Sequence, residues 1–423
     1  MVTLTVLGGG GEVGRMAILV RGRDKAILLD YGVNFDNEGR PVFPLHVRPK
    51  DLAAVVLSHA HLDHCGALPE LYISASPPLY TTALTSELAE IMFRDAIKLS
   101  GYYLPYEVEE VRNALRRVNP VNYGDEIDLG GGDSLKFINA GHVPGSSMIL
   151  VDIDGVKILF TGDFNLAPTN LLNGADLYSV PRNVDAVVME ATYAGGTHPP
   201  RDRLESDFVN AVKETIEGGG SVLLPSFTIG RAQELLVTLV KAGLVEVPIY
   251  VDGLARIANR IISKYPQFLR DPNLYAKAMR YSVEVMSSQQ RRSVVKERSI
   301  IITPAGMLKG GAALFYLKHI AGDDKNAVIL PSYQAPDSNG FELLSRGFVD
   351  IDKARVEVKA KVYWFDFSAH SGLQELMSFI SYFSEDTKII MVHTTPSSAF
   401  RLASQFPDRP IHVTLSPGED IEI

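Results

Sequence analysis

The sequence predicts an α/β protein in which a parallel α/β domain is inserted into a mixed, β-rich domain. Two observations carry this prediction. The chain has 423 residues, which is more than one hydrophobic core usually holds, so two domains are expected. Short apolar strands dominate both ends of the chain, whereas the middle alternates helices with buried strands. That order is expected when one α/β unit interrupts another.

Residues 1–200 form the first part of the β-rich domain. Short apolar runs separated by polar loops predict strands at 4–7, 26–29, 53–57, 135–138, 148–153, 157–160 and 186–189. A helix is expected over residues 85–99, where Thr85 can cap the N-terminus and apolar residues recur on one side.

Residues 201–355 form the predicted insertion. Strands are expected at 221–224, 249–251, 300–303 and 327–330, with helices at 207–217, 231–242 and 312–320. This alternation is typical of βαβ units in a parallel sheet. Residues 356–423 then return to short strands, at 358–365 and 389–392, with a helix over 373–383. They are predicted to complete the β-rich domain.

Composition limits the class of protein. The chain has no long uninterrupted apolar segment and no visible secretory signal, and its one cysteine, Cys65, rules out an internal disulfide. A cytoplasmic protein without a membrane partner is therefore expected. The formal net charge of −9 counts against a generic nucleic-acid coating protein, because non-specific binding to phosphates comes mainly from Lys and Arg.

The segment Leu-Ser-His-Ala-His-Leu-Asp-His, residues 57–64, carries the strongest chemical signal. It follows the predicted strand 53–57 and holds four potential metal ligands within six residues, namely His59, His61, Asp63 and His64. An extended turn aims His59 and His61 to one side, whereas Asp63 and His64 follow the turn into the next helix. Two clusters of donors result, as needed for zinc sites with about three protein ligands and one open position each.

Other candidate ligands also follow predicted strands. A lone histidine is seldom a ligand, but six of the 10 histidines lie in short loops near strand ends, including His142, His370 and His393. Asp163 follows the strand 157–160, and its two carboxylate oxygens suit a bridge between two metals. Asp30 follows the strand 26–29 and is expected to orient a ligand histidine or the bound water.

These residues resemble the signature of the metallo-β-lactamase superfamily. Its His-x-His-x-Asp-His motif is matched at residues 59–64, and the family's other first-domain positions are matched by Asp30, His142 and Asp163. The resemblance implies an αββα sandwich with two Zn²⁺ ions at the edge of its two sheets. By the resemblance, one ion is held by His59, His61 and His142, the other by Asp63, His64 and His393, and both by Asp163.

Three further fragments resemble the β-CASP branch of that superfamily. They are Val-Met-Glu-Ala-Thr-Tyr at 188–193 for motif A, Asp-Phe-Ser-Ala-His-Ser at 366–371 for motif B, and Met-Val-His-Thr at 391–394 for motif C. Segments 226–234 and 303–308 resemble RNA-processing members, such as RNase J-like enzymes and archaeal cleavage and polyadenylation specificity factors. One departure is Thr394-Thr395-Pro396 after His393, where the family commonly has Gly-Glu.

The resemblance implies a zinc-dependent ribonuclease that cleaves single-stranded RNA in RNA processing or decay, as an endonuclease, a 5′-to-3′ exonuclease or both. Two zinc ions lower the pKa of a shared water and clamp the attacking and leaving oxygens. Asp63 and Asp163 are expected to position that water. His370, paired with Glu190, is expected to protonate the departing 3′ oxygen.

Substrate phosphate contacts are expected from the inserted domain and motif B. Gly230 and Arg231 lie at a predicted strand-to-helix junction, where backbone N–H groups and the positive end of the helix favour a phosphate. Ser368 in motif B is a third candidate. The alternative is that these are ordinary turn residues.

Three other functions are compatible with parts of the sequence. A small-molecule metallo-hydrolase explains the first-domain motifs but gives the insertion no role. A β-CASP DNA nuclease is disfavoured by His393, because the DNA-repair branch usually has another residue there. A non-catalytic RNA-processing scaffold is disfavoured by the full ligand set. The sequence also permits a homodimer.

Overall fold

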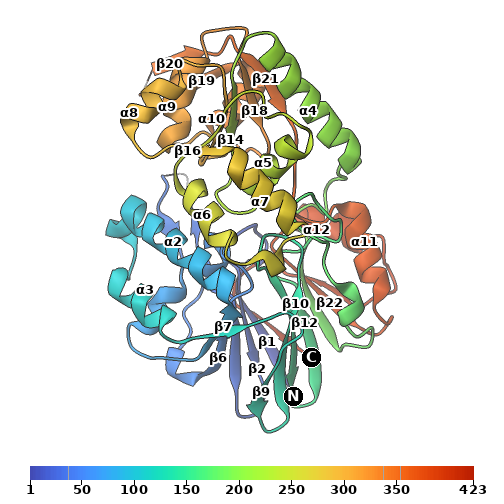
Figure 1. Ribbon diagram of the computed structural model, residues 1–423. Helices are drawn as coiled ribbons and strands as arrows, with labels where there is room; N and C mark the ends of the chain where they lie inside the picture. The colour runs from blue at the N-terminus through green and yellow to red at the C-terminus, as the bar shows by residue number, and fades with distance from the viewer. Residues whose placement is uncertain (37, 337, 353) are drawn as a thin grey trace. The chain divides into compact units, whose positions relative to one another are not determined.

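The computed structural model describes residues 1–36, 38–336, 338–352 and 354–423, and its contacts divide the chain into two units (Figure 1). Unit 1 consists of Met1–Pro168, Asn173–Thr197 and His370–Ile423, and unit 2 of Thr169–Leu172 and His198–Ala369. Unit 2 contains the range 201–355 and adjoining residues on both sides of it.

Two seven-stranded sheets form unit 1. The first has the order β24 (Glu419–Glu422), β1 (Thr3–Gly8), β2 (Ala17–Arg21), β3 (Ala26–Leu29), β6 (Leu52–Val56), β7 (Leu79–Thr82) and β8 (Val118–Val121). The second has the order β23 (Ile411–Val413), β22 (Lys388–Val392), β13 (Ala186–Glu190), β12 (Val156–Phe160), β11 (Ser147–Ile153), β10 (Asp133–Asn139) and β9 (Glu126–Gly130). A short hairpin is formed by β4 (Asn34–Phe35) and β5 (Pro41–Val42).

The two sheets pack face to face around one core. Ile18 and Ile27 of the first sheet belong to the same fully buried cluster as Phe137 and Ile149 of the second. These side chains alternate with residues that point to the outer face, as expected for stacked sheets.

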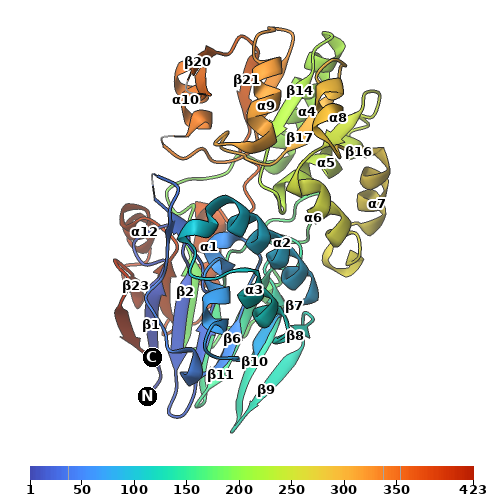
Figure 2. The ribbon, with the colours of Figure 1, turned by 90° about the vertical axis from the view of Figure 1, so that its left-hand side faces the viewer.

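Helices cover the outer faces of both sheets. On the first, α2 (Ala83–Ser100) contacts β7 and β8, and α3 (Val108–Leu115) lies beside α2 (Figure 2). On the second, α11 (Leu373–Tyr382) and α12 (Pro396–Ala403) bury Phe379 and Leu402 against the sheet. The expected αββα sandwich is therefore confirmed.

Unit 2 is built on a six-stranded sheet in which all neighbouring strands are parallel. Its order is β16 (Ser282–Glu284), β15 (Ile249–Val251), β17 (Ile300–Thr303), β14 (Val222–Pro225), β18 (Ala327–Leu330) and β21 (Lys361–Trp364). Its helices are α4 (Arg201–Glu217), α5 (Arg231–Lys241), α6 (Leu254–Ile262), α7 (Pro272–Tyr281), α8 (Ser288–Val294), α9 (Gly311–Ile320) and α10 (Asn339–Arg346). The expected parallel α/β architecture is confirmed here.

Several elements differ from the sequence prediction. Helix α4 begins at Arg201, six residues before the expected start, because its first turn is polar and carries little apolar periodicity. Between β15 and β17 no element was expected, yet α7 and α8 begin there at side-chain caps, Asp271 and Ser287. The strand expected over 358–365 is shorter, because residues before Lys361 do not pair in this sheet. Strand β20 (Ala354–Glu357) instead pairs with β19 (Phe348–Ile351).

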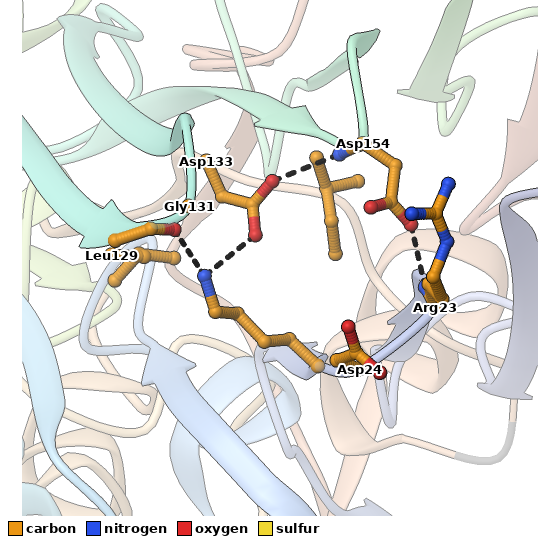
Figure 3. Close-up of a pocket in the computed structure, with 9 residues that line it drawn as sticks. Arg23, Asp24, Leu129, Gly131, Asp133 and Asp154 are labelled. Carbon is orange, nitrogen blue, oxygen red and sulfur yellow. Dashed lines mark hydrogen bonds and ion pairs between the residues drawn. The ribbon is translucent and has the colours of Figure 1, made fainter.

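Three hairpin turns close the lower end of the sandwich around a cavity of about 380 Å³ (Figure 3). Lys25 Nζ lies 2.7 Å from Asp133 Oδ2, the Asp154 N–H donates to Asp133 Oδ1 at 2.9 Å, and the Arg23 N–H donates to Asp154 Oδ2 at 2.5 Å. Lys25, Asp133 and Asp154 precede or begin β3, β10 and β12, so this cavity lies at the amino ends of those strands. In the described part of the chain, no helix has the length and apolar character needed to cross a bilayer.

Candidate active site

The candidate ligands of unit 1 follow the carboxyl ends of its strands. Asp30 follows β3, His59 follows β6, His142 follows β10, Asp163 follows β12 and His393 follows β22. Strands β3 and β6 are parallel, and β12, β13 and β22 are parallel to one another. The topology therefore brings residues that are distant in sequence to one edge of the sandwich.

Close backbone approach fixes the loops at this edge. His61 is the N-cap of α1 (Leu62–Cys65), so Asp63 and His64 lie in its first turn. A Cβ atom on Gly32 would lie 1.8 Å from the Asp63 carbonyl oxygen, so only glycine fits there. Gly162, just before Asp163, has φ +51°, and a Cβ atom on it would lie 2.8 Å from the Ser58 side chain.

A first cluster gathers three histidines and Asp163. The Nε2 atoms of His59 and His142 each lie 3.2 Å from His61 Nδ1. Both Nε2 atoms also lie 3.6 Å from Asp163 Oδ2. One ligand atom from each of the four residues lies within 4.8 Å of the others, a spacing that a single ion can span.

A second cluster lies on the other side of Asp163. His393 Nε2 is 3.3 Å from Asp63 Oδ2, and Asp63, His64 and His393 meet the same 4.8 Å criterion. His64 Nε2 lies 3.2 Å from Asp163 Oδ1. Asp163 thus turns Oδ2 toward the first cluster and Oδ1 toward the second.

Buried polar atoms without partners indicate that these clusters fit a metal. Among the described residues, His64 Nε2 and Asp163 Oδ1, which face each other at the second cluster, are buried and form no hydrogen bond. Leaving such atoms unsatisfied costs roughly 1–3 kcal/mol each, and a bound cation removes that cost. Imidazole nitrogens with carboxylate oxygens are also a typical donor set for zinc.

The electrostatics of the site favour the metal-binding protonation states of His59 and Asp163. Burial and the neighbouring histidines lower the pKa of His59 well below its usual value, so its ring is neutral. Burial raises the pKa of Asp163, but the surrounding histidines outweigh burial and keep that pKa well below its usual range. Burial opposes the charge of His64, yet Asp163 and Asp30 raise its pKa well above the usual value. A cation at this position would displace the proton.

Hydrogen bonds to the outer nitrogens orient the histidines. Asp30 Oδ2 lies 2.7 Å from His64 Nδ1, and the Ser58 hydroxyl donates to the same oxygen at 2.6 Å. Ser58 Oγ also lies 3.0 Å from His59 Nδ1. Thr192 Oγ1 lies 3.0 Å from His393 Nδ1. Sequence reasoning did not single out Ser58 or Thr192, although both lie inside the motifs around His59 and Glu190.

Glu190 and His370 form a pair beside the first cluster. Glu190 is fully buried, and its Oε1 lies 2.9 Å from His370 Nδ1. His370 Nδ1 is 4.0 Å from Asp163 Oδ2, and its ring lies 4.6 Å from the ring of His142. Burial lowers the pKa of His370, but Glu190 and Asp163 outweigh burial and raise it to about 9. The two carboxylates therefore favour the protonated form of this imidazole at the rim of the clusters.

The unusual sequence after His393 begins a helix. His393 has φ +54°, and its N–H donates to the Gly9 carbonyl at 2.8 Å. Thr395 is the N-cap of α12, its hydroxyl accepting from the Ser398 N–H at 3.4 Å, and Pro396 occupies the first helical position. The Thr-Thr-Pro departure therefore leaves His393 beside Asp63 and His64.

The expected phosphate contacts all lie in unit 2. Arg231 is the first residue of α5, and Gly230, with φ +82°, is its N-cap. The Gly230 N–H donates to Gln233 Oε1 at 2.7 Å, so it is engaged within the helix start. Ser368 is buried, and its carbonyl accepts from Arg201 Nη1 at 3.5 Å. Among these three residues, Arg231 is the one with a charged side chain.

Three family models match the chain. A model described as metallo-beta-lactamase superfamily matches residues 10–226, one described as Beta-Casp domain matches residues 232–343, and one described as Zn-dependent metallo-hydrolase RNA specificity domain matches residues 355–415.

Curated relatives match over most of their length. RNase aCSPSF2 of Saccharolobus solfataricus is 41% identical over 403 residues, covering 95% of this chain and 80% of that protein. Probable RNase MJ4 of Methanocaldococcus jannaschii is 35% identical, covering 90% and 91%. Transcription termination factor FttA of Pyrococcus horikoshii is 33% identical, covering 95% and 68%.

A solved structure has the same fold. It is a protein of unknown function from Enterococcus faecalis, with a TM-score of 0.63 and full coverage of both chains. Because the two sequences are only 17% identical, this similarity supports the fold and no statement about function.

Proposed function

This chain belongs to the metallo-β-lactamase superfamily, and we propose that it is a ribonuclease that hydrolyses phosphodiester bonds of single-stranded RNA with two bound zinc ions. One observation carries the proposal: Asp163 contacts two donor clusters, and the pair of His370 and Glu190 lies beside the first. The matched Beta-Casp and RNA specificity domains, together with relatives named RNases, support RNA as the substrate.

The donor set divides into two metal sites. We assign His59, His61 and His142 as the residues that would hold one ion and Asp63, His64 and His393 as those that would hold the other, with Asp163 shared between them. Two such ions supply an activated water and neutralise the charge that develops on the phosphodiester.

Side chains of this protein orient the attacking water and transfer the proton to the leaving group. The carboxylates of Asp63 and Asp163 accept hydrogen bonds from the attacking water and so orient it toward phosphorus. Glu190 contacts His370 Nδ1 and orients the ring, and His370 is the residue we assign to protonate the departing 3′ oxygen. The products are a 5′-phosphate and a 3′-hydroxyl. Asp30, Ser58 and Thr192 are positioning residues, because they contact only the outer nitrogens of His64, His59 and His393.

The test is an assay with end-labelled single-stranded RNA that carries a 5′-monophosphate, a 5′-triphosphate or a 5′-hydroxyl. We expect fragments that bear 5′-phosphates, and their sizes distinguish endonuclease from 5′-to-3′ exonuclease activity. Asp163→Asn should abolish hydrolysis, because it removes the residue shared by both clusters. If the RNA stays intact while a lactone or thioester is hydrolysed, the protein is a small-molecule hydrolase instead. If only DNA is cleaved, it is a DNA nuclease.

We further predict two zinc ions per chain. A single tetrahedral ion cannot satisfy seven donor residues that share one buried pocket. Elemental analysis of protein never exposed to a chelator measures the stoichiometry. His393→Ala should lose one ion and keep the other, because His393 is not among the donors of the first cluster. A saturated value of one ion in the unaltered protein would contradict the assignment.

A further inference from the structure

A cavity of about 320 Å³ lies on unit 1 outside the metal clusters, and aromatic side chains dominate its walls. Tyr102 and Tyr103 stand at its rim with 94% and 55% of their surfaces exposed, their rings 5.4 Å apart. Phe43 and the buried Tyr31 line its inner part. The volume falls near the lower end of the roughly 300–1,000 Å³ of small-molecule sites.

The cavity contains a carboxylate, which favours a ligand that donates hydrogen bonds. Glu70 lines the cavity, and among the described residues its carboxylate forms no hydrogen bond or ion pair, although His46 lies near enough to act on its charge. A half-buried carboxylate in this position offers two acceptor oxygens to an incoming ligand.

The loop beside the cavity carries exposed basic groups. In residues 43–50, Pro44 and Val47 point inward, whereas His46, Arg48 and Lys50 are exposed. Arg48 pairs with Asp51 at 3.6 Å, which leaves His46 and Lys50 as the groups that suit a phosphate backbone. Aromatic rings beside basic groups are the usual platform for single-stranded nucleic acid.

Hydrogen bonds connect the cavity to α1, the helix that contains the candidate metal ligands Asp63 and His64. Tyr31 follows Asp30, and its N–H donates to the His64 carbonyl at 2.8 Å. Its hydroxyl donates to the Leu45 carbonyl at 3.4 Å, and the Tyr106 hydroxyl donates to Gly66 at 2.6 Å. Tyr31, one of the lining residues, is therefore hydrogen-bonded to α1 and to the loop that carries Leu45, and Tyr106, which follows the lining residue Pro105, is hydrogen-bonded to the residue after α1.

We propose that this cavity binds one unstacked base of the RNA substrate and prefers guanine, with the base against Tyr102 and Tyr103 and its edge on Glu70. The proposal rests on the ribonuclease function above. Single-stranded bases are recognised by aromatic stacking and by hydrogen bonds to their Watson–Crick edges. Guanine presents two adjacent donors there, N1–H and the 2-amino group, which match the two oxygens of a carboxylate. Uracil presents one donor between two carbonyl groups that a carboxylate repels.

The test compares five-nucleotide RNAs with guanosine, inosine or uridine at the centre of a uridine chain. Inosine lacks only the 2-amino group of guanosine, so it removes one hydrogen bond. Binding to the zinc-loaded protein is followed by fluorescence anisotropy in a His370→Ala background that slows hydrolysis, with the RNA checked for integrity afterwards. We expect inosine to bind about tenfold more weakly than guanosine, the usual effect of one hydrogen bond to a charged group.

Two variants separate the stacking and hydrogen-bonding parts. Glu70→Gln should bring guanosine and inosine to similar affinity while uridine binding stays the same. Tyr103→Ala should weaken all three RNAs about tenfold, as expected for loss of one stacking partner. Tyr178→Ala and Glu385→Gln are matched controls, because both residues are exposed on unit 1 and line no part of the cavity.

Each outcome bears on one claim. Equal binding of guanosine and inosine with Glu70 intact, or equal behaviour of Tyr103→Ala and Tyr178→Ala, overturns the base site. If Tyr103→Ala abolishes binding of labelled decaproline but leaves RNA binding unchanged, the cavity takes a proline-rich peptide and the proposal is wrong. Failure of the unaltered protein to hydrolyse RNA overturns the proposed function instead, since these binding ratios do not depend on hydrolysis.

Discussion

At the scale of single residues, the rings of His59, His64 and His393 each place one nitrogen on an orienting partner and the other in a cluster. His64 gives Nδ1 to Asp30 and turns Nε2 toward Asp163. His370 instead gives Nδ1 to Glu190, and its Nδ1 is 4.0 Å from the nearest Asp163 oxygen. An imidazole is therefore a candidate ligand where one nitrogen faces the cluster, as in His64, and a candidate proton donor where the nitrogen nearest the cluster is bound to Glu190, as in His370.

His370→Ala tests that division. We expect metal content near that of the unaltered protein and RNA hydrolysis slowed by roughly 10²-fold or more, the usual contribution of a positioned general acid. Elemental analysis and single-turnover hydrolysis on one preparation measure both quantities. Loss of one zinc ion in the variant would show that His370 is a ligand and that its role has been misassigned.

The pKa of His370 also predicts a pH dependence. Glu190 and Asp163 raise that pKa to about 9 against the effect of burial. A general acid acts in its protonated form, so activity is present below this pKa and falls as pH rises through it. Bound cations repel the protonated ring, which moves the fall to a lower pH. The kcat/KM profile should show a descending limb at or below pH of about 9, and the same limb in His370→Ala would refute the assignment.

At the scale of elements, the start of α5 joins three segments of unit 2. Glu234 is buried in its first turn, and Oε1 lies 2.5 Å from Arg201 Nη2 of α4. The same carboxylate accepts the N–H groups of Asn170 at 3.1 Å and Leu171 at 2.8 Å. Burial raises the pKa of Glu234, but Arg201 and these donors outweigh burial and lower it. The charge is thus matched by partners from two other segments.

Glu234→Gln should lower the free energy of unfolding by about 3 kcal/mol at neutral pH, because it leaves Arg201 without its buried partner. The folded pKa lies below the unfolded value of about 4.3, so the carboxylate stabilises above that value and loses its effect as pH falls through the folded pKa. The difference in the free energy of unfolding between Glu234→Gln and the unaltered protein should therefore decrease as the pH falls through the folded pKa of Glu234.

Glu205→Gln is the matched control. Glu205 also pairs with Arg201, at 3.0 Å, but its side chain is more exposed than that of Glu234. Its removal should cost under about 1 kcal/mol. Thermal unfolding of both variants across pH measures the effect, and equal losses would contradict the importance of burial.

At the scale of the whole molecule, continuous apolar runs were the most predictable part of the fold. The strands expected at 26–29, 300–303 and 327–330 coincide with β3, β17 and β18, whose residues are buried throughout. Strand β9 was missed because its residues alternate between partly and fully exposed and carry little apolar signal. The pairing of β1 with β24 joins the two ends of the chain and has no local signature.

The candidate site divides in the same way. Spacing within one loop identified His59, His61, Asp63 and His64, because all four lie in six residues. The hydrogen bonds of Ser58 to Asp30 and of Thr192 to His393 join residues 28 and 201 positions apart. Such pairings depend on strand order rather than on local sequence. The hydrogen bond from the Gly230 N–H to Gln233 could not be predicted either. The sequence shows that a donor is available at the helix start, but not whether a capping side chain or a ligand accepts from it.

The ribonuclease function predicts that unit 2 contributes to RNA binding through Arg231 at the start of α5. A guanidinium beside a helix N-terminus suits a backbone phosphate. Arg231→Ala should therefore weaken RNA binding and flatten its salt dependence, because one fewer phosphate contact releases fewer counterions. Hydrolysis of a small phosphodiester, which needs only the donor clusters of unit 1, should change little.

The control for that experiment removes an arginine that is remote from any helix start, and Arg346→Ala is the variant compared. Arg346 is the last residue of α10 in the same unit, with 62% of its side chain exposed, and its only ion pair among the described residues is with Glu342 at 3.2 Å. RNA affinity and its salt dependence should stay near those of the unaltered protein in this variant. The alternative role of Arg231 is a surface ion pair worth under about 1 kcal/mol. In that case the two variants would behave alike, or Arg231→Ala would impair both substrates equally, because the loss would then reflect a general disturbance of the fold.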